Sequence, residues 1–210
     1  MNIFLSWSGE RSRLVAEAFQ QCLPLIFDRL DIYLSTSMNK GIRWNVALNQ
    51  ALDKADFAIL CVTKENYSAP WLIYEAGVLS KTAGADKVAP FLLDADFPKF
   101  HGPITEFQQC TVFEREDLRK LIFTVSEIYA QREKGIPPSI LEGRFKMAYD
   151  DAEMGLERRL KEALAVQTQE DGTEDMARKT LANSQRLLDI SKENQTLLRD
   201  IIFDMKNRCP

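Results

Sequence analysis

The chain has 210 residues, of which 45% are hydrophobic and 28% are charged. This composition is that of an ordinary folded protein, and the length suits one sizeable domain with an appendage. Lys and Arg number 27 against 31 Asp and Glu, a net charge of −4, so we expect no direct contact with nucleic acid or with an anionic membrane.

Short apolar runs alternate with helical patterns up to residue 134. The segment 56–62, DFAILCV, is almost continuously apolar, which favours a strand buried on both faces. Such alternation with short loops predicts an α/β fold with a flavodoxin-like, doubly wound sheet of five parallel strands, followed by a helical C-terminal region. In chain order we predict strand 2–7, helix 11–27, strand 30–34, helix 44–55, strand 56–62, helix 71–82, strand 87–94, strand 109–113 and helix 115–132.

The chain changes character after residue 134. Residues 135–139 read GIPPS, a helix-breaking stretch that predicts a linker, and helical patterns follow at 140–166 and 176–207. Apolar residues in the last pattern recur at spacings of three and four with Asn194 among them, as in a short coiled coil, although a helical hairpin packed on its own domain fits equally well. We therefore predict that the C-terminal region serves oligomerisation or partner docking. The two predicted parts are 1–134 and 135–210.

The cysteines and the histidine restrict the available chemistry. The four cysteines form no C-x-x-C pair, which is typical of a reducing compartment. The opening residues lack a signal-peptide pattern and no run approaches the roughly 20 apolar residues of a membrane span, so we expect a cytoplasmic protein. His101 is the single histidine, in a loop-like context, so we expect neither a metal site nor a mechanism that needs two histidines.

Three segments are predicted to meet at one edge of the sheet. In a doubly wound sheet, ligands bind beyond the carboxyl ends of the strands, at the point where the strand order reverses. The first strand ends at Ser6, the loop 35–43 follows the second strand, and 63–70 follows the third and leads into the helix that bears Glu75. We expect these segments to form a crevice.

One carboxylate and three tryptophans fall near this predicted crevice. Trp71 and Glu75 are four residues apart and share a helical face, while the apolar stripe through Leu72 is expected to point elsewhere. Trp7 and Trp44 supply two further aromatic side chains near the same edge. Each has a simpler interpretation, because a Trp at a helix start often fills a core and a lone Glu on a helix is usually solvated.

The pattern as a set resembles a bacterial Toll/interleukin-1 receptor (TIR) domain. The resemblance rests on Ser-Trp at the end of the first strand, Gly-x-x-Trp after the second, an ADFAILCVT-like third strand, and Ser-x-x-Trp-x-x-x-Glu beyond it. It covers roughly residues 1–130 and does not extend over 137–210. The matching positions are Ser6, Trp7, Gly41, Trp44, Ser68, Trp71 and Glu75.

The resemblance implies an NAD glycohydrolase, which cleaves the nicotinamide–ribose bond of NAD to nicotinamide plus ADP-ribose or a cyclic isomer. It places the catalytic glutamate at Glu75, the ring that stacks on the ligand at Trp7, and the loop that gates the site at 35–43. Several such enzymes carry Arg where this chain has Ser8, so Arg11 and Arg43 become candidates for contacting the pyrophosphate. NAD is then a substrate, and no separate cofactor is expected. The predicted substrate-binding residues are Trp7, Ser8, Arg11, Gly41, Arg43, Trp44 and Trp71.

The resemblance also implies a bacterial antiphage defence effector that is activated by homo-oligomerisation through TIR–TIR contacts, in some cases as filaments. Residues 137–210 would then link it to a sensor protein or a nucleotide signal. Two alternatives remain: a non-enzymatic TIR scaffold, and an enzyme similar to nucleoside deoxyribosyltransferases, which also use a Glu on a related sheet. A phospho-receiver domain is disfavoured, because SWSGE lacks the acidic pair expected after the first strand.

Overall fold

The computed structural model describes residues 1–35, 50–82, 84, 87–94 and 111–166. The chain divides into two units, Met1–Val166 and Gln167–Pro210, and the described residues all belong to the first. The predicted helix 176–207, with its coiled-coil pattern, therefore lies outside the described residues. Within the described part of the chain, no helix is both long enough and apolar enough to cross a membrane.

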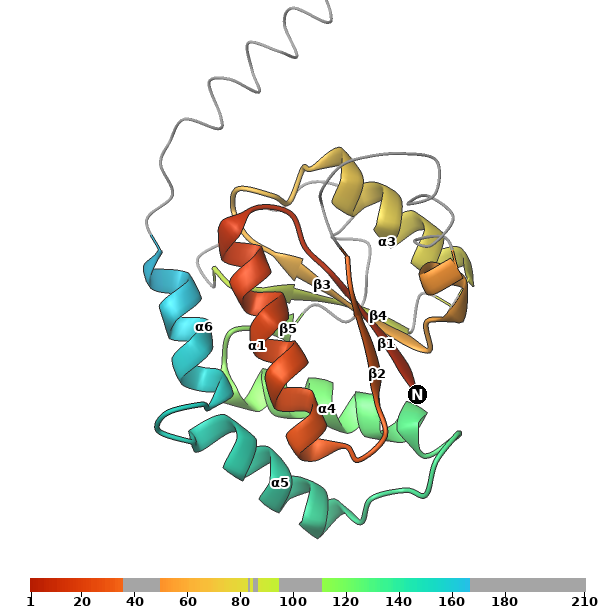
Figure 1. Cartoon of the computed structure of the whole chain (residues 1–210), viewed down its shortest axis with the longest axis vertical. Coiled ribbons are helices and arrows are strands. Elements are labelled where there is room, and N and C mark those ends of the chain that lie inside the picture. The colour runs from red at the N-terminus through yellow and green to blue at the C-terminus, as the bar shows by residue number, and fades with distance from the viewer. Residues whose placement is uncertain (36–49, 83, 85–86, 95–110, 167–210) are drawn as a thin grey trace, which may run out of the picture. The chain divides into compact units, whose positions relative to one another are not determined.

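Five parallel strands form a single sheet in the order β2-β1-β3-β4-β5 (Figure 1). The central strand β3 is buried at all six positions, as its continuous apolar run predicts. The predicted α/β class and the flavodoxin-like strand order are thus confirmed, with the strand order reversing between β1 and β3. The strands are β1 Asn2–Ser6, β2 Asp31–Leu34, β3 Phe57–Val62, β4 Val88–Leu92 and β5 Thr111–Val112.

Helices cover both faces of this sheet (Figure 1). On one face α1 (Glu10–Ile26) and α4 (Arg115–Tyr129) pack with Ile3 and Leu5 in the larger core cluster. On the other face α3 (Pro70–Thr82) and a short helix at 50–54 pack with Phe4. Because side chains alternate along a strand, Ser6 follows Phe4 onto the α3 face.

The C-terminal part of the first unit consists of α5 (Pro138–Asp150) and α6 (Leu156–Ala165), where the sequence pattern predicts one continuous helical stretch. The break lies at Asp151, whose side-chain carboxylate accepts backbone N–H groups of Glu153 and Met154 at 2.9 and 2.6 Å. Both helices contribute buried residues to the core shared with α1. The predicted division near residue 134 thus falls between α4 and α5, inside one compact unit.

The packing of α6 predicts a large stability difference between two leucines one turn apart. Leu160 is fully buried, whereas Leu164 is 43% exposed. We expect Leu160→Ala to lower the free energy of unfolding by about 2–5 kcal/mol, because it removes core contacts and leaves a cavity. Leu164→Ala should change it by less than about 0.5 kcal/mol. Equilibrium urea denaturation measures both, and equal effects would show that α6 does not belong to the core.

Candidate functional site

Three polar side chains from distant parts of the chain meet at the carboxyl ends of β1 and β2. Ser6 is the last residue of β1, Ser35 follows β2 directly, and Glu75 lies in the middle of α3. The backbone N–H of Ser35 donates to the carbonyl of Leu5 at 2.8 Å, which extends the β1–β2 pairing to this position. The predicted meeting of these segments is therefore seen for the residues that the structure describes.

Glu75 is the centre of this cluster. Its side chain is completely buried, as are those of Ser6 and Ser35. The Ser6 hydroxyl donates to carboxylate oxygen Oε2, and the Ser35 hydroxyl donates to Oε1. Each carboxylate oxygen is thus held by one hydroxyl that comes from the end of a different strand.

Burial dominates the electrostatics of Glu75. Removal from water raises the pKa of Glu75, whereas the hydroxyls of Ser35 and Ser6 and the indole of Trp71 act in the opposite direction. Among the described residues, no Lys or Arg forms an ion pair with this carboxylate. Within the described part of the chain, the polar partners of this carboxylate are thus neutral donors, which is an unusual arrangement for a buried Glu.

The structure changes the interpretation of α3 and of its tryptophan. Glu75 does not lie on a separate face from the apolar stripe, because it is as deeply buried as Leu72 and points toward the strand ends. Trp71 is half-buried and packs against the α3-side core, with its ring 5.4 Å from that of Tyr74. Core filling thus accounts for much of Trp71, and its indole also acts against the rise in the pKa of Glu75, which places it next to the cluster.

The structure separates Trp7 from Trp71. Trp7 packs against the core cluster on the α1 face, whereas Trp71 packs on the α3 face. The expected gathering of tryptophans in one crevice is therefore not seen for this pair, because Trp7 follows Ser6 and the alternation of the strand turns it to the other side. The indole nitrogen of Trp7 is buried and makes no hydrogen bond to any residue in the described ranges.

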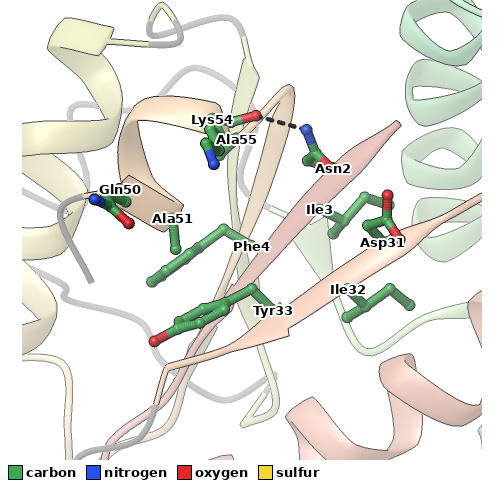
Figure 2. A pocket seen from close by; sticks show the side chains of 10 residues that line it. All are labelled: Asn2, Ile3, Phe4, Asp31, Ile32, Tyr33, Gln50, Ala51, Lys54 and Ala55. Atoms are coloured by element: carbon green, nitrogen blue, oxygen red, sulfur yellow. Dashed lines mark hydrogen bonds between the residues drawn. The ribbon is translucent and has the colours of Figure 1, made fainter. Parts of the chain in front are cut away.

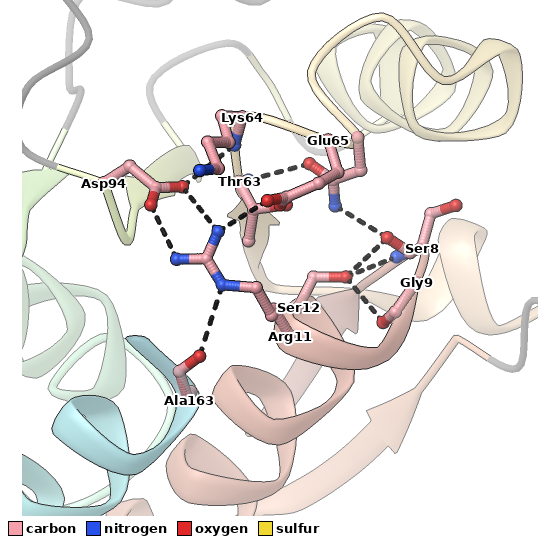
Figure 3. Close-up of polar contacts among 10 residues, drawn as sticks. Ser8, Gly9, Arg11, Ser12, Thr63, Lys64, Glu65, Asp94 and Ala163 are labelled. Carbon is pink, nitrogen blue, oxygen red and sulfur yellow. Dashed lines mark hydrogen bonds and ion pairs between the residues drawn. The ribbon is translucent and has the colours of Figure 1, made fainter. Parts of the chain in front are cut away.

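Arg11, a predicted pyrophosphate contact, makes several structural contacts in the described part of the chain. The side chain is 4% exposed, and its guanidinium forms ion pairs with Glu65 and Asp94 at 2.6 Å each (Figure 3). Its Nε donates to the carbonyl of Ala163 on α6 at 3.3 Å (Figure 3). Arg11 thus ties α1 to α6 and to the ends of β3 and β4, and the pyrophosphate contact predicted for it stays a prediction.

Ser8 is held mainly through its backbone. Its N–H donates to the hydroxyl of Ser12 at 2.9 Å, and its carbonyl accepts that hydroxyl at 2.6 Å (Figure 3). The next residue, Gly9, has a φ of 93°, a backbone conformation that residues other than Gly rarely adopt. The turn after β1 is thus closed by hydrogen bonds to the Ser12 side chain, and the substrate contact predicted for Ser8 stays a prediction. The predicted residues Gly41, Arg43 and Trp44 lie outside the described residues.

The sequence interpretation missed Asn66, which ties two of the converging segments together. Asn66 is 3% exposed, and its Nδ2 donates to the carbonyls of Ser8 and Cys61 at 3.0 and 2.9 Å. Its Oδ1 accepts the backbone N–H of Thr63 at 2.8 Å. Asn commonly forms turns, and its position just after a buried strand was the only feature of the sequence that could have indicated this role.

A cavity of about 380 Å³ lies on the same sheet face as Ser6 and Ser35, nearer the amino ends of the strands (Figure 2). Phe4 and Tyr33 line it, with their rings stacked at a centroid distance of 5.4 Å. They precede the two serines by two residues on β1 and β2, so the four side chains share one face.

Among the described residues, no group of three or more His, Cys, Asp or Glu could hold a metal ion.

Comparison of the chain with models of known protein families gives no match, and comparison with curated protein sequences gives none either. The case for a function therefore rests on the geometry of the Glu75 cluster and on the motif pattern.

Proposed function

We propose that this protein is a TIR-type NAD glycohydrolase in which Glu75 supports cleavage of the nicotinamide–ribose bond. The observation that carries the proposal is the burial of Glu75, without a cationic partner among the described residues, beside the point where the strand order reverses. Burying a carboxylate costs several kcal/mol unless a charge compensates it. A Gln would dock α3 to the two serines without that cost, so the presence of Glu at this position favours a chemical role.

The chemistry suits a single carboxylate. The C1′–N bond breaks and its electron pair leaves with nicotinamide, which becomes neutral while positive charge develops on the ribose. A carboxylate in a site of low dielectric constant stabilises that charge or holds the ribose hydroxyls. Water then adds to C1′ and loses a proton, giving ADP-ribose; attack by a group of the same molecule gives a cyclic isomer. A cation next to Glu75 would oppose this stabilisation, and none is seen among the described residues.

Complete coverage of Glu75 means that NAD must gain access to it through a rearrangement. We propose that this rearrangement accompanies homo-oligomerisation through TIR–TIR contacts. A sensor or nucleotide signal would act through residues 137–210. On this proposal the protein is a cytoplasmic antiphage effector. Its NAD cleavage should respond to assembly more than to NAD concentration alone.

The experiment is a series of protein concentrations incubated with NAD, with nicotinamide and ADP-ribose products quantified by chromatography. We expect equal amounts of nicotinamide and of the ribose product, and a rate that rises more steeply than in proportion to protein. Light scattering on the same samples reports assembly. Samples that assemble yet release no nicotinamide would contradict the proposal.

The same coverage of Glu75 favours one rival, a non-enzymatic TIR scaffold. In a scaffold, Glu75 would only fasten α3 to the ends of β1 and β2. Assembly without NAD turnover in the experiment above is the result expected of a scaffold. Transfer of a base between free nucleosides would instead indicate the deoxyribosyltransferase-like alternative.

A further inference from the structure

The two serines that contact Glu75 occupy positions where packing alone would favour apolar residues. Phe4 precedes Ser6 on the same face of β1, and Leu60, the partner of Ser6 across the ladder to β3, is fully buried and apolar. Ser6 and Ser35 are fully buried as well. A buried hydroxyl is costly unless it is hydrogen-bonded, and both hydroxyls bond to Glu75.

Both serines are also held rigidly. Ser6 is paired with Leu60 in the parallel ladder, and the backbone N–H of Ser35 bonds to Leu5. Their hydroxyls donate to different oxygens of the Glu75 carboxylate. Together they therefore fix the plane of the carboxylate as well as its distance from the strands. A single contact would leave the carboxylate free to rotate about its last bond.

We propose that Ser6 and Ser35 are positioning residues that hold the Glu75 carboxylate ionised and in one orientation for attack on the ribose centre. This inference rests on the proposed function, because it assigns the serines a part in the same site. Hydrogen bonds to an ionised acceptor are stronger than neutral ones, so two such donors favour the anion that the chemistry needs. A carboxylate displaced by about 1 Å loses up to roughly 100-fold in rate.

The test uses the full chain and two independent measurements. The first is nicotinamide release from NAD, with kcat and KM determined separately. The second is the titration of the Glu75 side-chain carboxyl carbon by NMR, assigned by its absence in Glu75→Gln. The variants are Ser6→Ala and Ser35→Ala, with Ser6→Cys and Ser35→Cys as size-conserving changes that retain only a weak donor.

The matched control is Ser80→Ala. Ser80 lies on the same helix as Glu75, and its hydroxyl donates to the backbone carbonyl of Ala76 at 2.7 Å rather than to the carboxylate. On the strands that carry the serines, Tyr33 and Asp31 are the titratable side chains whose alternation places them on this face, and neither is among the causes of the raised pKa of Glu75. Changes in the titration of Glu75 can thus be traced to the serines.

We expect each Ala variant to lower kcat by about 10-fold or more with little change in KM, because orientation is lost while binding persists. Each should also raise the pKa of Glu75, since removal of a donor disfavours the anion, and the Cys variants should fall between wild type and Ala. Ser80→Ala should alter neither quantity. Loss of stability with an unchanged titration and an unchanged kcat in the folded variants would overturn the inference. If assembled wild type releases no nicotinamide, the proposed function fails, and the titration alone then decides whether the serines hold the anion.

Discussion

Replacing Glu75 with Gln should lower nicotinamide release from NAD by at least roughly 100-fold. Gln keeps the shape of the side chain but removes the negative charge that the developing positive charge on ribose requires, and losing one electrostatic stabiliser of a transition state typically costs 10²–10³ in rate. The measurement is single-turnover release of nicotinamide at matched protein concentrations. The matched surface change Glu127→Gln, on α4 and exposed, should leave the rate as in wild type.

The fold should survive the Glu75→Gln change, which makes the loss of activity interpretable. Burial raises the pKa of Glu75 above its ordinary value of 4.5, so the folded state binds more protons than the unfolded state just above that pH. Stability of the wild type therefore falls as the pH rises through this window, whereas Gln lacks this dependence. Urea denaturation should find the variant at least as stable as wild type at neutral pH. Unchanged NAD cleavage in the folded variant would remove Glu75 from the mechanism.

Replacing Arg11 with Ala should destabilise the fold by about 3 kcal/mol. The change leaves the carboxylates of Glu65 and Asp94 close together without their shared cation, and removal of one member of a buried ion cluster typically costs this much. It also removes the donor to the Ala163 carbonyl, so α6 loses a contact with the carboxyl end of the sheet. Denaturant unfolding gives the free energy directly.

Arg13 provides the control two residues along the same helix. It also pairs with two carboxylates, those of Glu10 and Glu17, but its side chain is 36% exposed. Exposed pairs of this kind contribute little, so Arg13→Ala should cost less than about 1 kcal/mol. Equal costs for the two variants would show that the Arg11 cluster behaves as a surface network. A raised KM for NAD with unchanged stability in Arg11→Ala would support its predicted contact with substrate.

The elements of the sheet were predictable because their signals are local. Apolar runs such as 57–62 and the helical spacing in 115–129 are visible within one segment, and the described strands and helices lie within a few residues of the predicted ends. The first half of the helix predicted at 44–55 lies outside the described residues. The helical stretch 140–166 was predicted as helix but not as two helices. The turn there depends on the short-range contacts of Asp151, which periodicity does not report.

The candidate site was predictable only in part. The order of the strands implied that the ends of β1 and β2 meet the start of the β3–α3 connection, which placed Glu75 near Ser6. The roles of the serines did not follow, because a Ser at the end of a strand is an unremarkable residue. The ion pairs of Arg11 did not follow either, because a cation near a crevice resembles a ligand for phosphate until its partners are known.

Local patterning in the amino-acid sequence was sufficient to predict the fold class and the positions of the strands along the chain, and to identify Glu75 as a candidate site residue. The tertiary structure alone decided which oxygens of Glu75 meet which hydroxyls, since Ser6 and Ser35 are 69 and 40 residues away along the chain. It likewise decided the ion pairs of Arg11, whose two carboxylate partners are 54 and 83 residues away. Backbone periodicity records only which face a residue takes within its own element. Contacts across such separations depend on strand pairing and helix packing, which no single segment encodes.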